Sequence, residues 1–294
     1  MIIYSVGVAH PTEDIIMGKV FLNDSVVEAG DARIAADDSG FLYGQGLFET
    51  MRAVGGKVFR VDDHLDRLTA SCEALGIKIG YERDYIKEAI NKTLAANELD
   101  DARVRLTVSG GSMSSEEFVG TLLVTAAEFA AYPAEYYSNG VTVTLCDYRQ
   151  NSIDPLAGHK TTNYFARLIA LQQAHAKKAA ENLWFTTENK LAEGCVSNVF
   201  IVKNGVLLTP RADTPVLPGI ARKTVLEIAE KEGVSFEQKD LFINDLLGAD
   251  EVFVTNSIMT VLPVATVEAH AVANGKPGEV TKYLLKCYND MLGD

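Results

Sequence analysis

The chain has 294 residues, of which 47% are hydrophobic and 23% charged, proportions typical of a globular protein with one large domain or two ordinary ones. A formal net charge of −13 argues against nucleic acid or an anionic membrane as a partner, because either would repel the chain. The cysteines and histidines show no CxxC, HxH or HExxH spacing, and no apolar run is long enough to cross a bilayer. The sequence also starts without the pattern of a secretory signal. We therefore expect a cytoplasmic protein without a metal ion.

The first half of the chain predicts strands and helices in alternation. One hairpin is expected over residues 18–29, with its turn at Asn23-Asp24, and a second joins 47–54 to 57–61 through Gly55-Gly56. Helical spacing of apolar residues then predicts a helix that Asp62 and Asp63 cap and that ends at Gly76. A second helix is expected over 83–97, followed by strands at 103–109 and 121–126.

The pattern weakens over residues 126–140, which contain a proline and end in Asn-Gly, and we place a domain junction there. The prediction is a smaller N-terminal α/β domain of residues 1–126, a linker of 127–134 and a larger C-terminal domain of 135–294. In the second half we expect a long helix over 163–180, a helix after Pro218-Gly219, and several strands, at 141–148, 182–187, 198–203, 206–209 and 251–256. Interleaved strands and helices with several hairpins indicate a mixed α/β (α+β) fold and not a doubly wound parallel sheet.

Lys160 has an unusual setting among the lysines of the chain. It lies in PLAGHKTTNYFARL, a turn-rich segment that leads into a predicted helix, where the helix dipole disfavours a positive charge. An exposed lysine at a helix start is the simpler interpretation of this feature alone. A buried lysine, however, can act as a nucleophile that traps carbonyl groups.

Further downstream, LAEGCVSNVF places Glu193 in a glycine-containing turn between two predicted strands. A surface carboxylate is one interpretation. The other is a functional carboxylate that pairs with a pyridine nitrogen and keeps that ring protonated. Ser197 and Asn198 are either turn formers or hydrogen-bond partners of a ligand.

Three segments are candidates for binding a phosphate group. Pro218-Gly219 begins a predicted helix, whose first N–H groups form a natural anion site. The strand at 251–256 leads into Asn256 and Ser257, which either contact the anion or begin a turn. Arg67, on the helix that follows Asp63, offers a guanidinium, although a surface arginine is the alternative.

In their chain order these segments resemble the class IV (fold-type IV) pyridoxal-phosphate enzymes. The family includes branched-chain and D-amino-acid aminotransferases and 4-amino-4-deoxychorismate lyase. The resemblance extends from about residue 18 to about residue 263 and is carried by YGQGLFETMRAVGGKVFRVDDHLDRL, KTTNYFARL, EGCVSNVF, LPGIARKTVLEIA and FVTNSIMTVLPV. It implies the two-domain fold of D-amino-acid aminotransferase, pyridoxal 5′-phosphate as cofactor, a small and carboxylated amino substrate, and a homodimer.

The resemblance also implies roles for individual residues. Lys160 is the catalytic lysine, which forms a Schiff base with the cofactor and moves the substrate proton, and Glu193 binds the ring nitrogen. The remaining cofactor contacts that it implies, together with the hydrogen-bond candidates above, are Arg67, Tyr164, Ser197, Asn198, Gly219, Ile220, Ala221, Asn256 and Ser257. Candidate substrate contacts are Phe48, Thr50, Arg103 and Arg105.

Within the family, the sequence favours the lyase over an aminotransferase. The loop SMSSEEF lacks the Arg and His that D-amino-acid aminotransferases carry there. Arg103 replaces a tyrosine of the branched-chain enzymes, although Arg105 matches their arginine, and KTTNY is one residue shorter than their segment. Thr50 resembles a threonine of the lyases, whereas an arginine that some lyases carry after the SGG turn is missing.

The lyase substrate carries two carboxylates, for which Arg103 and Arg105 are the candidate contacts. Because side chains on a strand alternate between its faces, we expect only one of these arginines to face the substrate. The alternatives to the lyase are an aminotransferase and a non-catalytic homologue that still binds the cofactor. The intact pair of Lys160 and Glu193 argues against the non-catalytic homologue, and no repeat or charge block suggests a scaffold protein.

Overall fold

The computed structural model describes residues 18–114 and 120–293, which form two compact units. The described residues of the N-terminal unit are 18–114, 120–130 and His159–Tyr164. The C-terminal unit consists of Ala131–Gly158 and residues 165–293. Residues 159–164 lie within the segment 135–294 that was predicted as the C-terminal domain, yet the structure groups them, and Lys160 with them, with the N-terminal unit.

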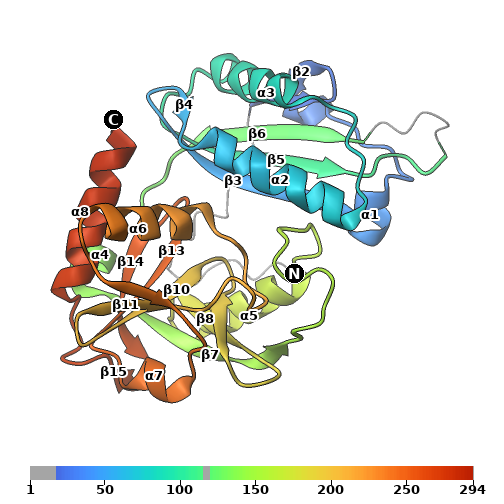
Figure 1. Ribbon diagram of the computed structural model, residues 1–294. Coiled ribbons are helices and arrows are strands. Elements are labelled where there is room, and N and C mark those ends of the chain that lie inside the picture. Colours follow the sequence, from blue (N-terminus) through green and yellow to red (C-terminus); the bar gives the residue numbers. More distant parts are fainter. Residues whose placement is uncertain (1–17, 115–119, 294) are drawn as a thin grey trace. The chain divides into compact units, whose positions relative to one another are not determined.

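An antiparallel sheet with the strand order β2-β1-β6-β5-β3-β4 forms the framework of the N-terminal unit (Figure 1). Both predicted hairpins are present, with Asn23 at a φ of 57° in the first turn. The strands are β1 (Lys19–Leu22), β2 (Ser25–Glu28), β3 (Gly46–Val54), β4 (Lys57–Val58), β5 (Ala102–Ser109) and β6 (Leu122–Glu128).

Helices α2 (Val61–Leu75) and α3 (Arg83–Ala96) pack against one face of this sheet, while the short helix α1 (Ser39–Tyr43) precedes β3. Apolar residues of both helices meet alternate residues of the central strands in one core, which includes Met51, Leu65, Ile90, Val104, Leu106 and Val124. The two helices confirm the sequence prediction. The predicted cap is wrong: Asp62 and Asp63 lie in the first turn of α2, and its N-cap position is Arg60, which makes no capping side-chain bond.

The sheet of the C-terminal unit is closed on itself. Its strand order is β12-β11-β10-β13-β14-β7-β8-β9, and β9 also pairs with β10, so that the strands from β10 to β9 form a ring. The strands are β7 (Val141–Gln150), β8 (Glu181–Thr186), β9 (Leu191–Gly194), β10 (Asn198–Lys203), β11 (Val206–Thr209), β12 (Phe236–Gln238), β13 (Glu251–Asn256), β14 (Thr260–Val267) and β15 (His270–Ala271).

Helices surround this closed sheet (Figure 1). They are α4 (Ala134–Asn139), α5 (Phe165–Ala176), α6 (Ile220–Lys231), α7 (Ile243–Leu247) and α8 (Glu279–Gly293). Helix α5 is shorter than the predicted 163–180 segment, because the chain enters it from the loop that carries Lys160. The mixed α/β fold class is confirmed by these elements. Among the described residues, no helix has both the length and the apolar character needed to span a membrane.

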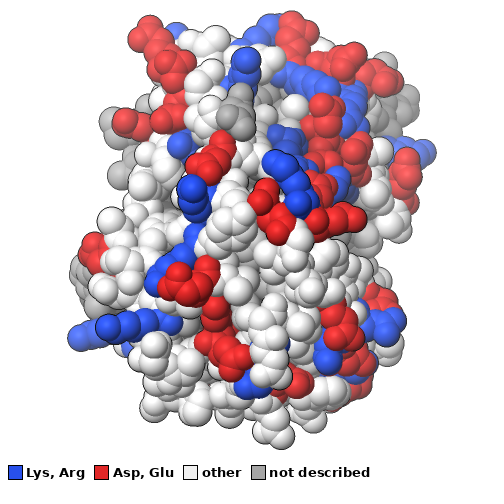
Figure 2. Space-filling model, turned by 60° about the vertical axis from the view of Figure 1, so that its left-hand side comes forward, with Lys and Arg blue, Asp and Glu red and all other residues white. Residues whose placement is uncertain are grey.

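Acidic and basic side chains are interspersed on the face of the molecule shown in Figure 2. In the N-terminal unit, Arg83 contacts the carboxylates of both Asp62 and Asp66, and Lys87 lies 2.6 Å from Asp62. The negative charge of this part of α2 is therefore locally balanced.

Candidate active site

The backbone around Lys160 is held by strand β3. The carbonyl oxygen of Lys160 accepts a hydrogen bond of 2.9 Å from Phe48 N–H, and Thr162 N–H donates to Gly46 O over the same distance. Leu47 and Thr161 thus form an isolated antiparallel bridge. Because three consecutive residues of the loop pair with a buried strand, the backbone of Lys160 is fixed by the sheet of the N-terminal unit.

The Lys160 amine lies against two aromatic rings. Its Nζ is 4.4 Å from the ring centre of Phe48 and 5.7 Å from that of Tyr164. The two rings themselves meet edge to face, with their centres 5.3 Å apart. The structure therefore brings together three residues that the sequence analysis assigned separately to catalysis, cofactor and substrate.

Arg105 contacts the same phenylalanine. Its guanidinium carbon lies 3.9 Å from the centre of the Phe48 ring, and its Nε donates to Thr107 Oγ1 over 3.2 Å. Burial lowers the pKa of Arg105 to about 10, and the neighbouring charge of Arg103 contributes to the shift. Arg105 is thus a partly buried cation that lies against an aromatic ring and a hydroxyl group.

The expectation that Arg103 and Arg105 point to opposite faces of their strand is wrong. Residues two apart on a strand share a face, and β5 buries Ala102, Val104 and Leu106 against the helices. Both arginines therefore lie on the opposite face of the sheet. Thr50, which is paired with Arg105 across the strands, shares this face.

Arg67 belongs to a buried polar cluster. Its Nε donates to Glu49 Oε1 over 2.9 Å, its Nη2 contacts Glu49 Oε2, and His64 Nδ1 lies 2.7 Å from that oxygen. Burial by itself would raise the pKa of Glu49, but the charge of Arg67 and the hydrogen bonds outweigh it and lower the pKa to about 2. Burial lowers the pKa of His64, so the neutral ring donates its Nδ1 proton to the carboxylate. Arg67 is therefore a buried and oriented guanidinium, in contrast to the alternative of a surface arginine.

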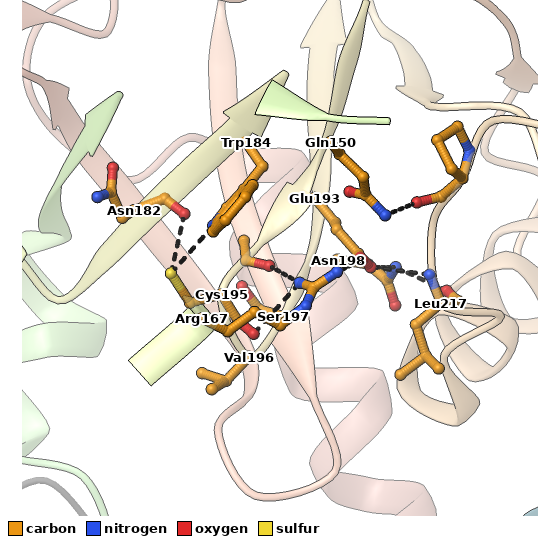
Figure 3. A network of polar contacts seen from close by, with 12 residues as sticks. Gln150, Arg167, Asn182, Trp184, Glu193, Cys195, Val196, Ser197, Asn198 and Leu217 are labelled. Atoms are coloured by element: carbon orange, nitrogen blue, oxygen red, sulfur yellow. Dashed lines mark hydrogen bonds and ion pairs between the residues drawn. The ribbon is translucent and has the colours of Figure 1, made fainter. Parts of the chain in front are cut away.

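In the C-terminal unit, Glu193 is a buried carboxylate that accepts several hydrogen bonds (Figure 3). Arg167 Nη2 lies 2.5 Å from Oε1, while Leu217 N–H donates to Oε2 over 2.8 Å. Asn198 Nδ2 lies 3.4 Å from Oε2 and donates to Leu217 O over 2.9 Å. Glu193 lies in the short strand β9 and is not a surface turn residue.

A second buried carboxylate, Glu181, fixes the residues that follow Glu193. It accepts hydrogen bonds from Cys195 N–H, Val196 N–H and Ser197 Oγ at 2.8, 3.1 and 2.7 Å. Burial raises the pKa of Glu181, and these hydrogen bonds oppose the shift. A Cβ atom at Gly194 would lie 2.6 Å from this carboxylate, which explains why glycine occupies that position.

The phosphate candidates of this unit adjoin the same segment. Gly219 is the N-cap of α6 and makes no side-chain cap, so Ile220 and Ala221 present the first N–H groups of the helix. A Cβ at Gly219 would lie 2.0 Å from Asn198 Oδ1, so glycine is required for this close approach. Asn256 Nδ2 donates to Val196 O over 3.0 Å, and its Oδ1 accepts from the N–H groups of residues 258 and 259. Ser257 lies in the turn between β13 and β14.

These donor sets fit pyridoxal phosphate chemically. A buried carboxylate suits a protonated ring nitrogen, an uncapped helix start suits a phosphate, and a lysine amine against aromatic rings suits a carbonyl carbon. The sequence analysis missed Arg167, Glu181, Glu49 and His64. For Arg167 a signal existed, because an arginine in the first turn of a helix opposes the helix dipole. For Glu181, Glu49 and His64, no feature of the neighbouring sequence distinguishes a site residue from an ordinary one.

Comparison with known proteins agrees with this chemistry. The family model of amino-transferase class IV matches residues 46–267. The chain belongs to this family. Class IV aminotransferases use pyridoxal phosphate, so the protein is a pyridoxal-phosphate-dependent enzyme, as the motifs predicted.

Relatives in the class IV family include several aminotransferases. The D-alanine aminotransferase of Listeria innocua is 31% identical over 274 residues, which cover 90% of this chain and 93% of that protein. A putative branched-chain-amino-acid aminotransferase of Methanocaldococcus jannaschii is 32% identical over 283 residues, which cover 93% of this chain and 96% of the relative.

Solved structures of this class also resemble the chain. The branched-chain amino acid aminotransferase of Escherichia coli matches with a TM-score of 0.89 and 25% identity, over 94% of this chain and 95% of that one. A putative 4-amino-4-deoxychorismate lyase of Legionella pneumophila matches with a TM-score of 0.82 and 26% identity, over 88% of this chain and 96% of that one. The mixed two-unit fold is thus that of class IV enzymes.

Proposed function

We propose that this class IV enzyme transfers amino groups between a carboxylated amino acid and a 2-oxo acid. The observation that carries the proposal is the Phe48 ring, against which both the Lys160 amine and the Arg105 guanidinium lie. In this proposal the Lys160 amine is the nucleophile and Arg105 is the cation that binds a carboxylate, and both contact the same aromatic ring. The aminotransferases among the relatives support the same reaction class.

In this proposal each residue has a defined task. Bound pyridoxal phosphate supplies an electron sink, which allows the substrate carbon to lose a proton. Lys160 would hold the cofactor, and its amine would carry that proton. Glu193 holds the ring nitrogen, with Ser197 and Asn198 supporting the same segment. Arg67 and the N–H groups at the start of α6 hold the phosphate, with Asn256 and Ser257.

Arg105 orients a substrate carboxylate, because a buried guanidinium binds a carboxylate through paired hydrogen bonds. Arg103 shares its face of the sheet and offers a contact for a second carboxylate. The substrate class that fits this surface is therefore a dicarboxylic amino acid or oxo acid, at least for one of the two reaction partners. Phe48, Thr50 and Tyr164 line the same side.

The 4-amino-4-deoxychorismate lyase that the sequence favoured is the second candidate. Its substrate also carries two carboxylates, so two arginines on one face suit it equally. The specific observation in its favour is the likeness to the putative lyase of Legionella pneumophila together with Thr50 opposite Arg105.

An end-point assay with purified protein separates the candidates. The enzyme is offered D-alanine or L-leucine with 2-oxoglutarate, and separately 4-amino-4-deoxychorismate, with the Lys160→Ala variant as the control. Amino-group exchange that the variant lacks supports the aminotransferase. Release of pyruvate and 4-aminobenzoate without exchange would reject it in favour of the lyase.

We also propose that the enzyme is a cytoplasmic homodimer. Helix α1 exposes large apolar side chains: Phe41 is 77% exposed, Tyr43 70% and nearby Met113 61%. Clustered apolar side chains of this size typically mark an interface, and a second copy of the chain would cover them. Sedimentation analysis tests this, since Phe41→Ser is expected to shift the protein toward a monomer.

A further inference from the structure

Arg167 makes a short ion pair with Glu193 and was not among the residues expected to form the site. It lies in the first turn of α5, while Glu193 lies in β9. Its Nη2 is 2.5 Å from Glu193 Oε1, and its Nη1 donates to Gly194 O over 3.0 Å and lies 3.4 Å from Cys195 O (Figure 3). One guanidinium thus contacts the side chain of Glu193 and the backbone that carries it.

The contacts require the shape of an arginine. The planar guanidinium directs separate N–H groups at the carboxylate and at the carbonyl oxygens, which a single ammonium group does not do at once. Its carbon also lies 5.7 Å from the ring centre of Trp184, the single tryptophan of the chain. The Arg167 side chain is 22% exposed and that of Glu193 4%, so the pair extends from the interior toward the surface of the unit.

Both oxygens of Glu193 are held from different directions. Arg167 fixes Oε1, and the Leu217 N–H group fixes Oε2 at 2.8 Å. A carboxylate has lone pairs left after two such bonds, and their directions are set once the plane of the group is set. The orientation of Glu193 therefore depends on Arg167.

We propose that Arg167 is a positioning residue, which fixes the carboxylate plane of Glu193 so that it is aligned with the ring nitrogen of the cofactor. This inference rests on the proposed role of Glu193. It assigns Arg167 no contact with the cofactor itself.

The test measures binding of pyridoxamine 5′-phosphate, which forms no bond with Lys160, to the full-length apoenzyme by calorimetry. Loss of one charge-assisted contact predicts a dissociation constant roughly 10- to 100-fold higher for Arg167→Met. Arg167→Lys keeps the positive charge but lacks the planar guanidinium with its separate N–H groups, so it is expected to recover only a small part of this loss. In the Glu193→Gln background, Arg167→Met is expected to add no further loss. Arg149→Met is the matched control, since Arg149 also binds a backbone carbonyl, that of Cys146, beside an aromatic ring.

Each outcome decides a different point. If Glu193→Gln binds like the wild type, the proposed role of Glu193 is wrong, and this inference falls with it. If Glu193→Gln weakens binding but Arg167→Met does not, only the inference is wrong. Equal losses from Arg167→Met with and without Glu193 would show an effect on the fold, and would also overturn it.

A spectroscopic signature separates positioning from general loosening. A misaligned carboxylate changes the protonation of the ring nitrogen, so the absorption band of bound pyridoxal phosphate and its pH dependence should shift in Arg167→Met. General loosening would lower the occupancy and leave the band in place, which would contradict the inference. Should Arg167→Met fail to fold, Arg167→Lys is measured in the same way, alone and with Glu193→Gln.

Discussion

Substitution of Glu49 by glutamine should destabilise the protein markedly, because Glu49 is a buried carboxylate that both Arg67 and His64 contact. The pKa of Glu49 is lowered from 4.5 to about 2. A shift of this size corresponds to about 3 kcal/mol of stability, and full burial means that solvent does not screen it. Glu49→Gln also removes a buried counter-ion of Arg67, and breaking a buried ion pair costs about 3–5 kcal/mol in comparable cases. We therefore expect a loss of about 3 kcal/mol near neutral pH.

The sign of the pH dependence follows from the direction of the shift. The pKa of Glu49 in the folded protein is below its unfolded value, so the carboxylate stabilises the fold above the unfolded pKa of 4.5 and loses this contribution as the pH falls toward about 2. The stability difference between the wild type and Glu49→Gln should therefore be largest near neutral pH and shrink in acid. Burial also lowers the pKa of His64, so protonation of His64 destabilises the fold in acid as well. For this reason the stability of the wild type is compared with that of Glu49→Gln at each pH.

Urea unfolding of the full chain at a series of pH values measures this difference. Asp62→Asn is the control, since Asp62 also contacts two cations, Arg83 and Lys87, but lies in solvent, where ion pairs contribute little. A loss below about 1 kcal/mol for Glu49→Gln at neutral pH, or a difference that does not change with pH, would refute the reasoning.

Other substitutions test the site more directly. Lys160→Ala should abolish amino-group exchange and the absorbance of covalently bound cofactor, while pyridoxamine 5′-phosphate still binds; unchanged exchange would exclude Lys160 as the catalytic residue. Arg105→Met should raise KM for carboxylated substrates by roughly 10- to 100-fold, with the dissociation constant of pyridoxamine 5′-phosphate nearly unchanged, as steady-state kinetics and calorimetry would show. Burial raises the pKa of Cys195, so iodoacetamide should label the half-buried Cys287 first, and mass spectrometry that finds Cys195 labelled earlier would contradict its burial.

Local features of the sequence were sufficient to predict most elements of the fold. The first hairpin follows from Asn23, which tolerates positive φ between two apolar runs, and the end of α2 follows from Gly76 in the left-handed conformation. Apolar residues at helical or alternating spacing determine which faces are buried. These signals act over a few residues, so a single sequence contains them in full.

Contacts between distant residues were not predictable in this way. The pairing of β9 with β10 closes the sheet of the C-terminal unit through one residue pair, Glu193 with Asn198. The spacing of apolar residues in the sequence does not predict this pair. The salt bridge between Arg167 and Glu193 joins a helix to a strand, and Glu49 contacts Arg67 from β3 to α2. Such pairs depend on tertiary packing, whereas the motifs that carry Lys160 and Glu193 could be recognised because each is contiguous.

The grouping of residues 159–164 with the N-terminal unit separates two properties of the enzyme. Lys160 is hydrogen-bonded to β3 and Arg105 lies in the neighbouring strand β5, so the proposed geometry between the amine and a substrate carboxylate depends on the hydrogen bonds of these strands. Glu193 and Arg167 belong to the closed sheet and helices of the other unit, and we propose that they determine the affinity for the cofactor ring. Substitution of Arg105 should therefore change KM and substrate preference while the cofactor affinity stays constant. Substitution of Glu193 or Arg167 should change the cofactor affinity while the substrate preference stays constant. If both kinds of variant altered both constants in proportion, the assignment of carboxylate binding to Arg105 and of ring binding to Glu193 would have to be abandoned.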